Sequence, residues 1–119
     1  MRKHARFELF EYAMIYTHEG ADPIRSVIID ISLGGAQVRS RTSVTSGATV
    51  VIDVAQPDAV EPFLVNAEIR YSNAIPNTDL FAVGFRFTPQ TAQEREKIAR
   101  YVHEFFRLQG EYLLEERNA

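Results

Sequence analysis

Hydrophobic and polar residues alternate over most of this chain. The clearest alternation covers Phe63 to Ser72, where every second residue is apolar and points to one side. Noisier alternation covers five further segments: Tyr12 to Tyr16, Ile24 to Ile31, Ala36 to Arg41, Thr49 to Val54 and Leu80 to Phe87. Turn-forming residues, mainly Gly, Pro, Asn and Asp, separate these segments. The pattern predicts six short strands.

No helical pattern lies between the predicted strands, which argues against a parallel nucleotide-binding sheet. Short strands joined by turns favour an antiparallel meander that closes into a small barrel, because closure removes exposed strand edges. Strict alternation in the strand Phe63 to Ser72 places Tyr71 in the core. Whether Tyr12 and Tyr16 line a pocket or the core stays open.

The hydrophobic period changes in the last quarter of the chain. Thr88-Pro89 is typical of a helix start with Pro in the first helical position, and Thr91 and Glu94 have capping-box spacing. Apolar residues then recur at helical spacing: Ile98, Tyr101, Val102, Phe105, Leu108 and Tyr112. We expect an amphipathic C-terminal helix with an acidic tail over residues 89–117. Its apolar stripe covers one mouth or side of the barrel, or alternatively forms a dimer.

Composition fits one soluble globular domain with a mainly β fold. The 119 residues include 13 Lys and Arg against 16 Asp and Glu, for a net charge of −3, and 45% are hydrophobic. Neither a repeat nor a linker divides the chain, so we expect a single domain over 1–119, with a flexible basic arm in 1–11 and the barrel in 12–87. No apolar stretch approaches the roughly 20 residues that span a bilayer. We expect a cytoplasmic location and no membrane partner.

Residues for catalysis or metal binding are scarce. His4, His18 and His103 stand far apart at no recognised metal-motif spacing, and the chain has no Cys. It also lacks a nucleophile elbow and the Gly-rich phosphate-binding loops. We therefore expect neither an enzyme nor a cofactor. The acidic net charge, with a single compact basic cluster, argues against binding of DNA or RNA.

The basic cluster is Arg2-Lys3-His4-Ala5-Arg6. Arg is the side chain best suited to bidentate binding of phosphate and of a guanine edge, and here two Arg stand four residues apart. A solvated basic terminus has the same composition, so this cluster alone does not identify a site.

A second cluster, Asp30-Ile31-Ser32-Leu33-Gly34-Gly35, ends one predicted strand and precedes the next, which starts at Ala36. Asp30 can accept hydrogen bonds from guanine N–H groups, and Ser32 can donate or accept. Gly35 lets the backbone approach a ligand closely and take a positive φ. An ordinary turn uses the same residues, because Asp and Ser side chains bind nearby backbone and Gly-Gly is common in turns.

Taken in this order, Arg-x-x-x-Arg followed by Asp-x-Ser-x-x-Gly resembles the PilZ domain, the bacterial receptor module for cyclic di-GMP. Two further segments are similar to the last two strands of that family: Ala67-Glu68-Ile69-Arg70-Tyr71 and Val83-Gly84-Phe85-Arg86-Phe87. The resemblance extends from Arg2 to about Gln109. It implies a six-stranded antiparallel PilZ-type β-barrel with a C-terminal α-helix.

The resemblance also implies cyclic di-GMP as the ligand and places its binding residues. Arg2 and Arg6 would clamp phosphates and guanine. Asp30 and Ser32 would hydrogen-bond a guanine, while Gly35 would permit close packing. The neighbouring Lys3 adds positive charge to the same site.

Arg39 and Arg41 point outward on the predicted strand after the turn, so one of them can add a phosphate contact; a solvated strand face is the alternative. Met1 stands where family members often carry a further Arg, which favours one ligand per domain here. We expect a receptor whose N-terminal arm orders over the ligand and which signals through an unidentified effector protein. The alternative is an interaction module that binds no nucleotide and forms oligomers, such as a homodimer, through its helix.

Overall fold

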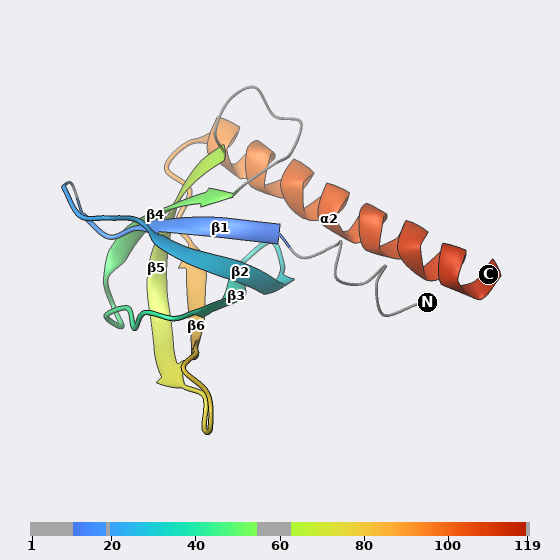
Figure 1. Ribbon diagram of the computed structural model, residues 1–119. Helices are drawn as coiled ribbons and strands as arrows, with labels where there is room; N and C mark the ends of the chain where they lie inside the picture. The colour runs from blue at the N-terminus through green and yellow to red at the C-terminus, as the bar shows by residue number, and fades with distance from the viewer. Residues whose placement is uncertain (1–10, 19, 55–62, 119) are drawn as a thin grey trace.

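The computed structural model describes residues 11–18, 20–54 and 63–118 (Figure 1). Its elements in chain order are β1 (Glu11–Tyr16), β2 (Ile24–Ile31), β3 (Gly35–Ser40), β4 (Thr49–Val54), β5 (Phe63–Ala74), β6 (Phe81–Phe87) and α2 (Ala92–Asn118). Every strand pairing is antiparallel, and the strands close into a barrel. The predicted mainly β fold, a six-stranded antiparallel barrel with a C-terminal helix, is confirmed.

The order of strands around the barrel differs from the predicted meander. It runs β1-β2-β3-β6-β5-β4, so β3 pairs with β6 and β1 pairs with β4. Two three-stranded meanders thus join edge to edge, and residues 41–48 carry the chain from one to the other. Alternation reports which face of a strand is buried but says nothing about its neighbours, which is why the simple meander was wrong.

The core fills the inside of the barrel because each strand sends alternate side chains inward. Each strand contributes a residue that is at most 1% exposed: Ile15, Ile28, Val38, Ile52, Val65 and Val83. Tyr12 and Tyr16 are exposed, so neither belongs to the core. The buried Ser26 hydroxyl donates to the Ala13 carbonyl oxygen at 2.9 Å, which satisfies the one polar side chain that β2 buries.

Helix α2 packs on the barrel beside β5 through its predicted apolar stripe. Ile98, Tyr101, Val102 and Phe105 are at most 6% exposed and join the core cluster of the strands. The prediction that the stripe covers the barrel is therefore confirmed for these four residues; the side chains of Leu108 and Tyr112 lie outside the described part. Figure 1 shows the helix continuing beyond the barrel. No helix in the described ranges is long and apolar enough to cross a membrane.

The start of α2 is tied to the barrel by Glu94. The helix begins at Ala92, so Pro89 is not in the first helical position as expected. The Glu94 amide donates to Thr91 Oγ1 at 3.1 Å, which is one half of the predicted capping box. The Glu94 carboxylate accepts from the Gln90 amide at 3.2 Å and from the Asn66 amide of β5 at 2.9 Å. Burial raises the pKa of Glu94, but these hydrogen bonds outweigh it and lower the pKa.

Two β-bulges interrupt the strand pairing. The register shifts between Ile28 and Asp30 in β2 and between Ile69 and Tyr71 in β5. The extra residue of a bulge disturbs the inward–outward alternation beyond it. Tyr71 consequently lies on the outer surface, half-buried, and the prediction that it lies in the core was wrong.

Candidate functional site

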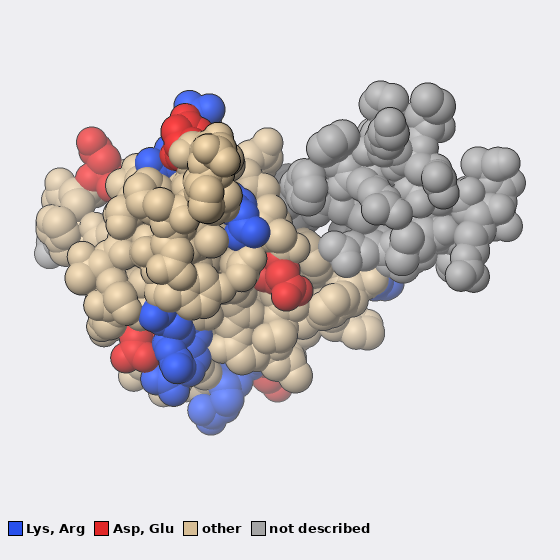
Figure 2. Space-filling view, turned by 90° about the horizontal axis from the view of Figure 1, so that it is seen from below, with Lys and Arg blue, Asp and Glu red and all other residues tan. Residues whose placement is uncertain are grey.

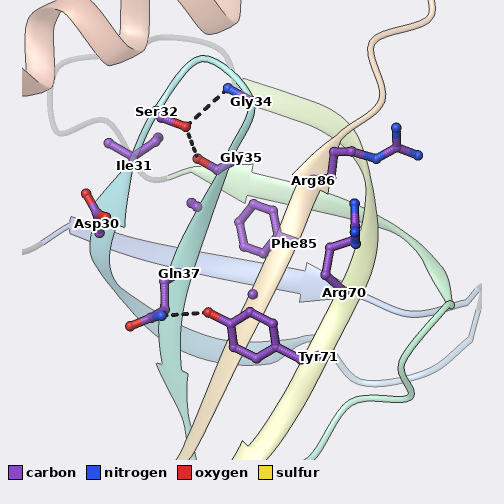
Figure 3. Close-up of a pocket in the computed structure, with 12 residues that line it drawn as sticks. Asp30, Ile31, Ser32, Gly34, Gly35, Gln37, Arg70, Tyr71, Phe85 and Arg86 are labelled. Atoms are coloured by element: carbon purple, nitrogen blue, oxygen red, sulfur yellow. Dashed lines mark hydrogen bonds between the residues drawn. The ribbon is translucent and has the colours of Figure 1, made fainter.

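Four residues form a row across the outer surface of β2, β3, β6 and β5. In register they are Asp30, Gln37, Gly84 and Tyr71. A Cβ added to Gly84 would lie 2.2 Å from a ring carbon of Tyr71, so the tyrosine ring lies directly across this glycine. The ring thereby spans β6, and Gln37 Nε2 on β3 donates a hydrogen bond to the Tyr71 hydroxyl at 2.6 Å (Figure 3).

A pocket of about 310 Å³, open to solvent, lies over this row. Its walls come from the end of β2, the β2–β3 turn, β3, β5 and β6 (Figure 3). Its charged residues are Asp30 on one side and Arg70 and Arg86 on the other. The volume is at the lower end of the roughly 300–1,000 Å³ typical of small-molecule sites. The pocket can therefore hold part of a ligand that carries both negative charge and hydrogen-bond donors.

The turn beside the pocket is held by Ser32. The Ser32 hydroxyl accepts from the Gly34 amide at 3.2 Å, and the Ser32 amide donates to the Gly35 carbonyl oxygen at 2.8 Å. Ser32 therefore stabilises the turn, as expected if this segment is an ordinary turn. Asp30 differs, because its exposed carboxylate makes no hydrogen bond or ion pair with any residue that the structure describes. No described residue therefore competes with a ligand for hydrogen bonds to this carboxylate.

Gly35 lies where β3 and β6 approach each other. A Cβ at this position would lie 2.1 Å from the carbonyl oxygen of Phe85. A backbone atom held in a sheet has little room to move, so the position requires glycine. The expected positive φ was wrong, since Gly20 and Gly47 are the described glycines that have one. The close approach seen here is to a neighbouring strand.

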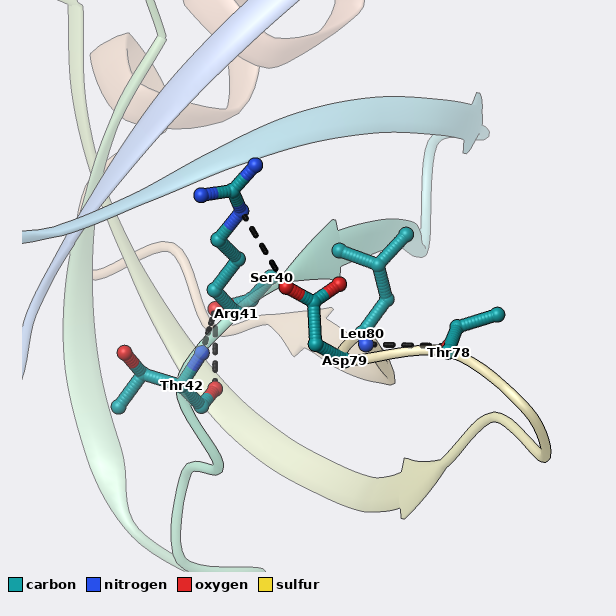
Figure 4. A network of polar contacts seen from close by, with 6 residues as sticks. All are labelled: Ser40, Arg41, Thr42, Thr78, Asp79 and Leu80. Atoms are coloured by element: carbon teal, nitrogen blue, oxygen red, sulfur yellow. Dashed lines mark hydrogen bonds and ion pairs between the residues drawn. The ribbon is translucent and has the colours of Figure 1, made fainter.

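Arg39 lies next to the pocket without lining it. Its Nη1 atom donates to Gln37 Oε1 at 2.8 Å, so its observed contact is with the side chain that holds Tyr71. Arg41 is further away and pairs with Asp79, 4.0 Å between Nε and Oδ2, near the tip of the β5–β6 hairpin (Figure 4). A phosphate contact from Arg39 stays a prediction.

Sequence reasoning missed four polar pocket residues: Gln37, Arg70, Tyr71 and Arg86. Alternation already points Gln37 and Arg86 outward, so they could have been proposed. Arg70 is the extra residue of the β5 bulge and Tyr71 follows it, so the two could not be placed together without the bulge. Arg86 also pairs with Glu68 of β5, 3.2 Å between Nη2 and Oε1. Figure 2 shows Lys and Arg side chains gathered on one part of the molecular face seen from below.

The predicted arm residues Arg2, Lys3 and Arg6 lie outside the described residues. Of the seven ligand-binding residues expected from the sequence, three line the pocket: Asp30, Ser32 and Gly35. Among the residues of the described ranges, no three His, Asp or Glu side chains are grouped as a metal ion would require.

A family model described as the PilZ domain matches residues 1–104. The fold is similar to that of the PilZ domain with c-di-GMP of YcgR from Escherichia coli, with 18% identity and a TM-score of 0.67, covering 85% of this chain and 86% of that one. The PilZ domain of CeSA from a cellulose-synthesizing bacterium is 20% identical with a TM-score of 0.62, covering 80% and 91%. A tetrameric PilZ domain from Xanthomonas campestris, self-assembled via a helical bundle, is 17% identical with a TM-score of 0.56, covering 74% and 47%. No curated protein matches the sequence.

Proposed function

Because the chain belongs to the PilZ domain family, a family of cyclic di-GMP receptors, we propose that it binds cyclic di-GMP in the pocket beside the β2–β3 turn. One observation carries this proposal: the carboxylate of Asp30, which has no hydrogen-bond or ion-pair partner among the described residues, faces Arg70 and Arg86 across one open pocket. A carboxylate accepts from the N1–H and N2–H groups of guanine. Guanidinium groups suit phosphate oxygens and the guanine O6/N7 edge. The pocket therefore offers an acceptor for guanine N–H groups and cations for a phosphate or for the O6/N7 edge.

Arg2 and Arg6 complete the proposed site from the N-terminal arm, with Lys3 adding charge. What supports them is the Arg-x-x-x-Arg pattern within a family match that includes residues 1–104. An arm that binds the ligand but not the empty barrel shifts toward the closed arrangement when ligand is present. Replacing Arg6 with Ala is expected to weaken binding, because it removes a charge-assisted contact worth about 1.5–3 kcal/mol.

The output of such a receptor is a changed surface that an effector protein reads in the cytoplasm. We assign this chain a role as receptor and adaptor without catalysis or a cofactor, as is general for PilZ domains. The chemistry of the effector is open, and the proposal concerns only the ligand that controls it.

Assembly through α2 is the second candidate function, and it rests on Phe106. This side chain is 51% exposed on the helix, while its neighbour Phe105 is 6% exposed and packs on the barrel. The similar Xanthomonas campestris domain forms tetramers via a helical bundle. A Phe106→Glu variant separates the two functions when its oligomeric state is measured by sedimentation and its ligand affinity by titration. Loss of an oligomer with cyclic di-GMP binding intact would show that assembly and ligand binding are independent.

The ligand proposal is tested by removing one carboxylate from the pocket and one from elsewhere. Asp30→Ala is expected to raise the Kd for cyclic di-GMP by about tenfold to a hundredfold, because a hydrogen bond to a charged group is lost. Asp22→Ala, in the exposed β1–β2 turn and outside the pocket, is the matched control and should leave the Kd unchanged. Equal Kd values for both variants and the unmodified chain would place the ligand elsewhere.

A further inference from the structure

A directed chain of hydrogen bonds runs under the pocket from β3 to β5. Arg39 Nη1 donates to Gln37 Oε1 at 2.8 Å, and Gln37 Nε2 donates to the Tyr71 hydroxyl oxygen at 2.6 Å (Figure 3). An arginine carries only donors, so its neighbour must present the amide oxygen to it. Arg39 thereby fixes which way the Gln37 amide points, and the amide nitrogen is left to face Tyr71.

This polarity determines what the Tyr71 hydroxyl can do. Its oxygen accepts from Gln37, which can offer only N–H on that side, so the phenolic hydrogen is not used in this contact. Within the described ranges, Gln37 is the hydroxyl's only hydrogen-bond partner, and Tyr71 lines the pocket. The unused O–H is thus a hydrogen-bond donor available to the contents of the pocket.

We propose that the Tyr71 hydroxyl donates to an acceptor atom of the bound nucleotide, and that Arg39 and Gln37 are positioning residues that hold this hydroxyl as a donor. The inference rests on the proposed function, because the ligand is the cyclic di-GMP assigned to this pocket. Suitable acceptors are O6 or N7 of guanine and the phosphate oxygens.

The Tyr71 ring is held in place by its surroundings. It lies across Gly84 with no room for a side chain between them, while its hydroxyl is tethered to Gln37. A group already fixed in its binding orientation loses little conformational freedom when the ligand arrives. The row therefore acts as a preformed half of the site, and Arg39 contributes to binding through Gln37.

With O6 as its acceptor, the Tyr71 hydroxyl would favour guanine over adenine. Adenine carries an amino group, a donor, where guanine carries the O6 acceptor. A hydroxyl held as a donor faces an unmatched donor on adenine, which disfavours that base. If the Tyr71 partner is guanine O6, removing the hydroxyl reduces the preference for cyclic di-GMP over cyclic di-AMP. If the partner is N7, which adenine also carries, or a phosphate oxygen, both nucleotides lose affinity equally.

The test uses Tyr71→Phe and Gln37→Glu, each measured by calorimetric titration with cyclic di-GMP and cyclic di-AMP. Tyr71→Phe keeps the ring over Gly84 and removes only the O–H. Gln37→Glu places a carboxylate that accepts from both Arg39 and Tyr71, so the phenolic hydrogen turns away from the ligand while both contacts remain. Each variant is expected to raise the Kd for cyclic di-GMP about tenfold.

The double variant separates the lost donor from the added negative charge. In the Tyr71→Phe background, Gln37→Glu should change the Kd little further, because the donor is already absent.

The positioning role of Arg39 is tested separately. Arg39→Lys keeps a donor for Gln37 and should bind cyclic di-GMP with a Kd close to that of the unmodified chain, whereas the Kd of Arg39→Met should approach the Tyr71→Phe value.

Two outcomes would overturn the inference while leaving cyclic di-GMP as the ligand. One is an unmodified Kd in Tyr71→Phe; the other is a full effect of Gln37→Glu in the Tyr71→Phe background. Absence of binding by the unmodified chain would overturn the proposed function and this inference together. Thermal unfolding of each variant confirms that a weaker titration comes from a folded protein.

Discussion

The polar row and the pocket over it depend on two glycines and on a carboxylate that has no hydrogen-bond or ion-pair partner in the described part of the chain. Gly84 leaves space for the Tyr71 ring, and Gly35 lets β3 approach β6. The Asp30 carboxylate makes no hydrogen bond or ion pair with the described residues. Together these features leave room for the Tyr71 ring and keep one acceptor available beside the pocket, which fits a binding surface better than a structural turn alone.

Gly35→Ala is expected to destabilise the fold. Its methyl group would overlap the Phe85 carbonyl oxygen, so the β3–β6 pairing must open, at a cost of about 3 kcal/mol in the free energy of unfolding. Gly34→Ala is the control next to it, since the nearest atom to an added Cβ is the Ser32 hydroxyl at 3.9 Å; a change within about 0.5 kcal/mol is expected. Urea unfolding measures both, and equal losses would contradict the close approach at Gly35.

Single residues could be predicted from the sequence where chemistry and local order were sufficient. Asp30, Ser32 and Gly35 were expected near a ligand because their pattern resembles that of the PilZ domain, and they do line the pocket. Arg70 and Tyr71 were not expected there. Their placement depends on one extra residue in β5, and nothing in the alternation of Phe63 to Ser72 indicates a bulge.

At the scale of elements, the strands follow the hydrophobic pattern closely because each buries one face. The differences lie at the ends, where the pairing partner sets the length. β5 continues to Ala74, two residues beyond the predicted end, because Ala74 pairs with Phe81 of β6. β3 begins at Gly35 rather than Ala36 because Gly35 pairs with Arg86.

The docking of α2 predicts unequal effects for two adjacent phenylalanines. Phe105→Ala removes a ring buried against the barrel and should lower the free energy of unfolding by about 3 kcal/mol. Phe106→Ala truncates a half-exposed ring and should change it by less than about 1 kcal/mol. Chemical unfolding of both variants provides the comparison. A larger loss for Phe106→Ala would mean that the helix presents the opposite face to the barrel.

The contact between Glu94 and β5 predicts a dependence of stability on pH. The pKa of Glu94 is lower in the folded chain than its ordinary value of 4.5. A lowered carboxyl pKa stabilises the fold above that value, and the contribution is lost as the pH falls through the folded pKa. Stability should therefore decrease less between about pH 6 and about pH 3.5 in Glu94→Gln than in the unmodified chain.

Urea midpoints at the two pH values measure this difference. Glu96→Gln, an exposed neighbour on the same helix, serves as the control and should keep the slope of the unmodified chain. If Glu94→Gln and Glu96→Gln gave the same pH dependence, the bridge from the helix start to the Asn66 amide would contribute nothing.

At the scale of the whole molecule, the pocket is a product of strand order. Gln37 and Tyr71 come from β3 and β5, and both lie beside Gly84 because β6 runs between those strands. The predicted meander would have placed β4 next to β3 and separated these residues. The class of fold was therefore predictable from local pattern, while the site required long-range pairing that local pattern does not encode.

The most direct test of the account is a calorimetric titration of the unmodified chain with cyclic di-GMP, with cyclic di-AMP as the comparison. The account predicts binding with a Kd in the micromolar range or tighter, clear preference for the guanine nucleotide, and a stoichiometry of one ligand per chain. No heat with either nucleotide, together with no shift in thermal unfolding, would contradict the receptor function and leave assembly through α2 as the function to examine.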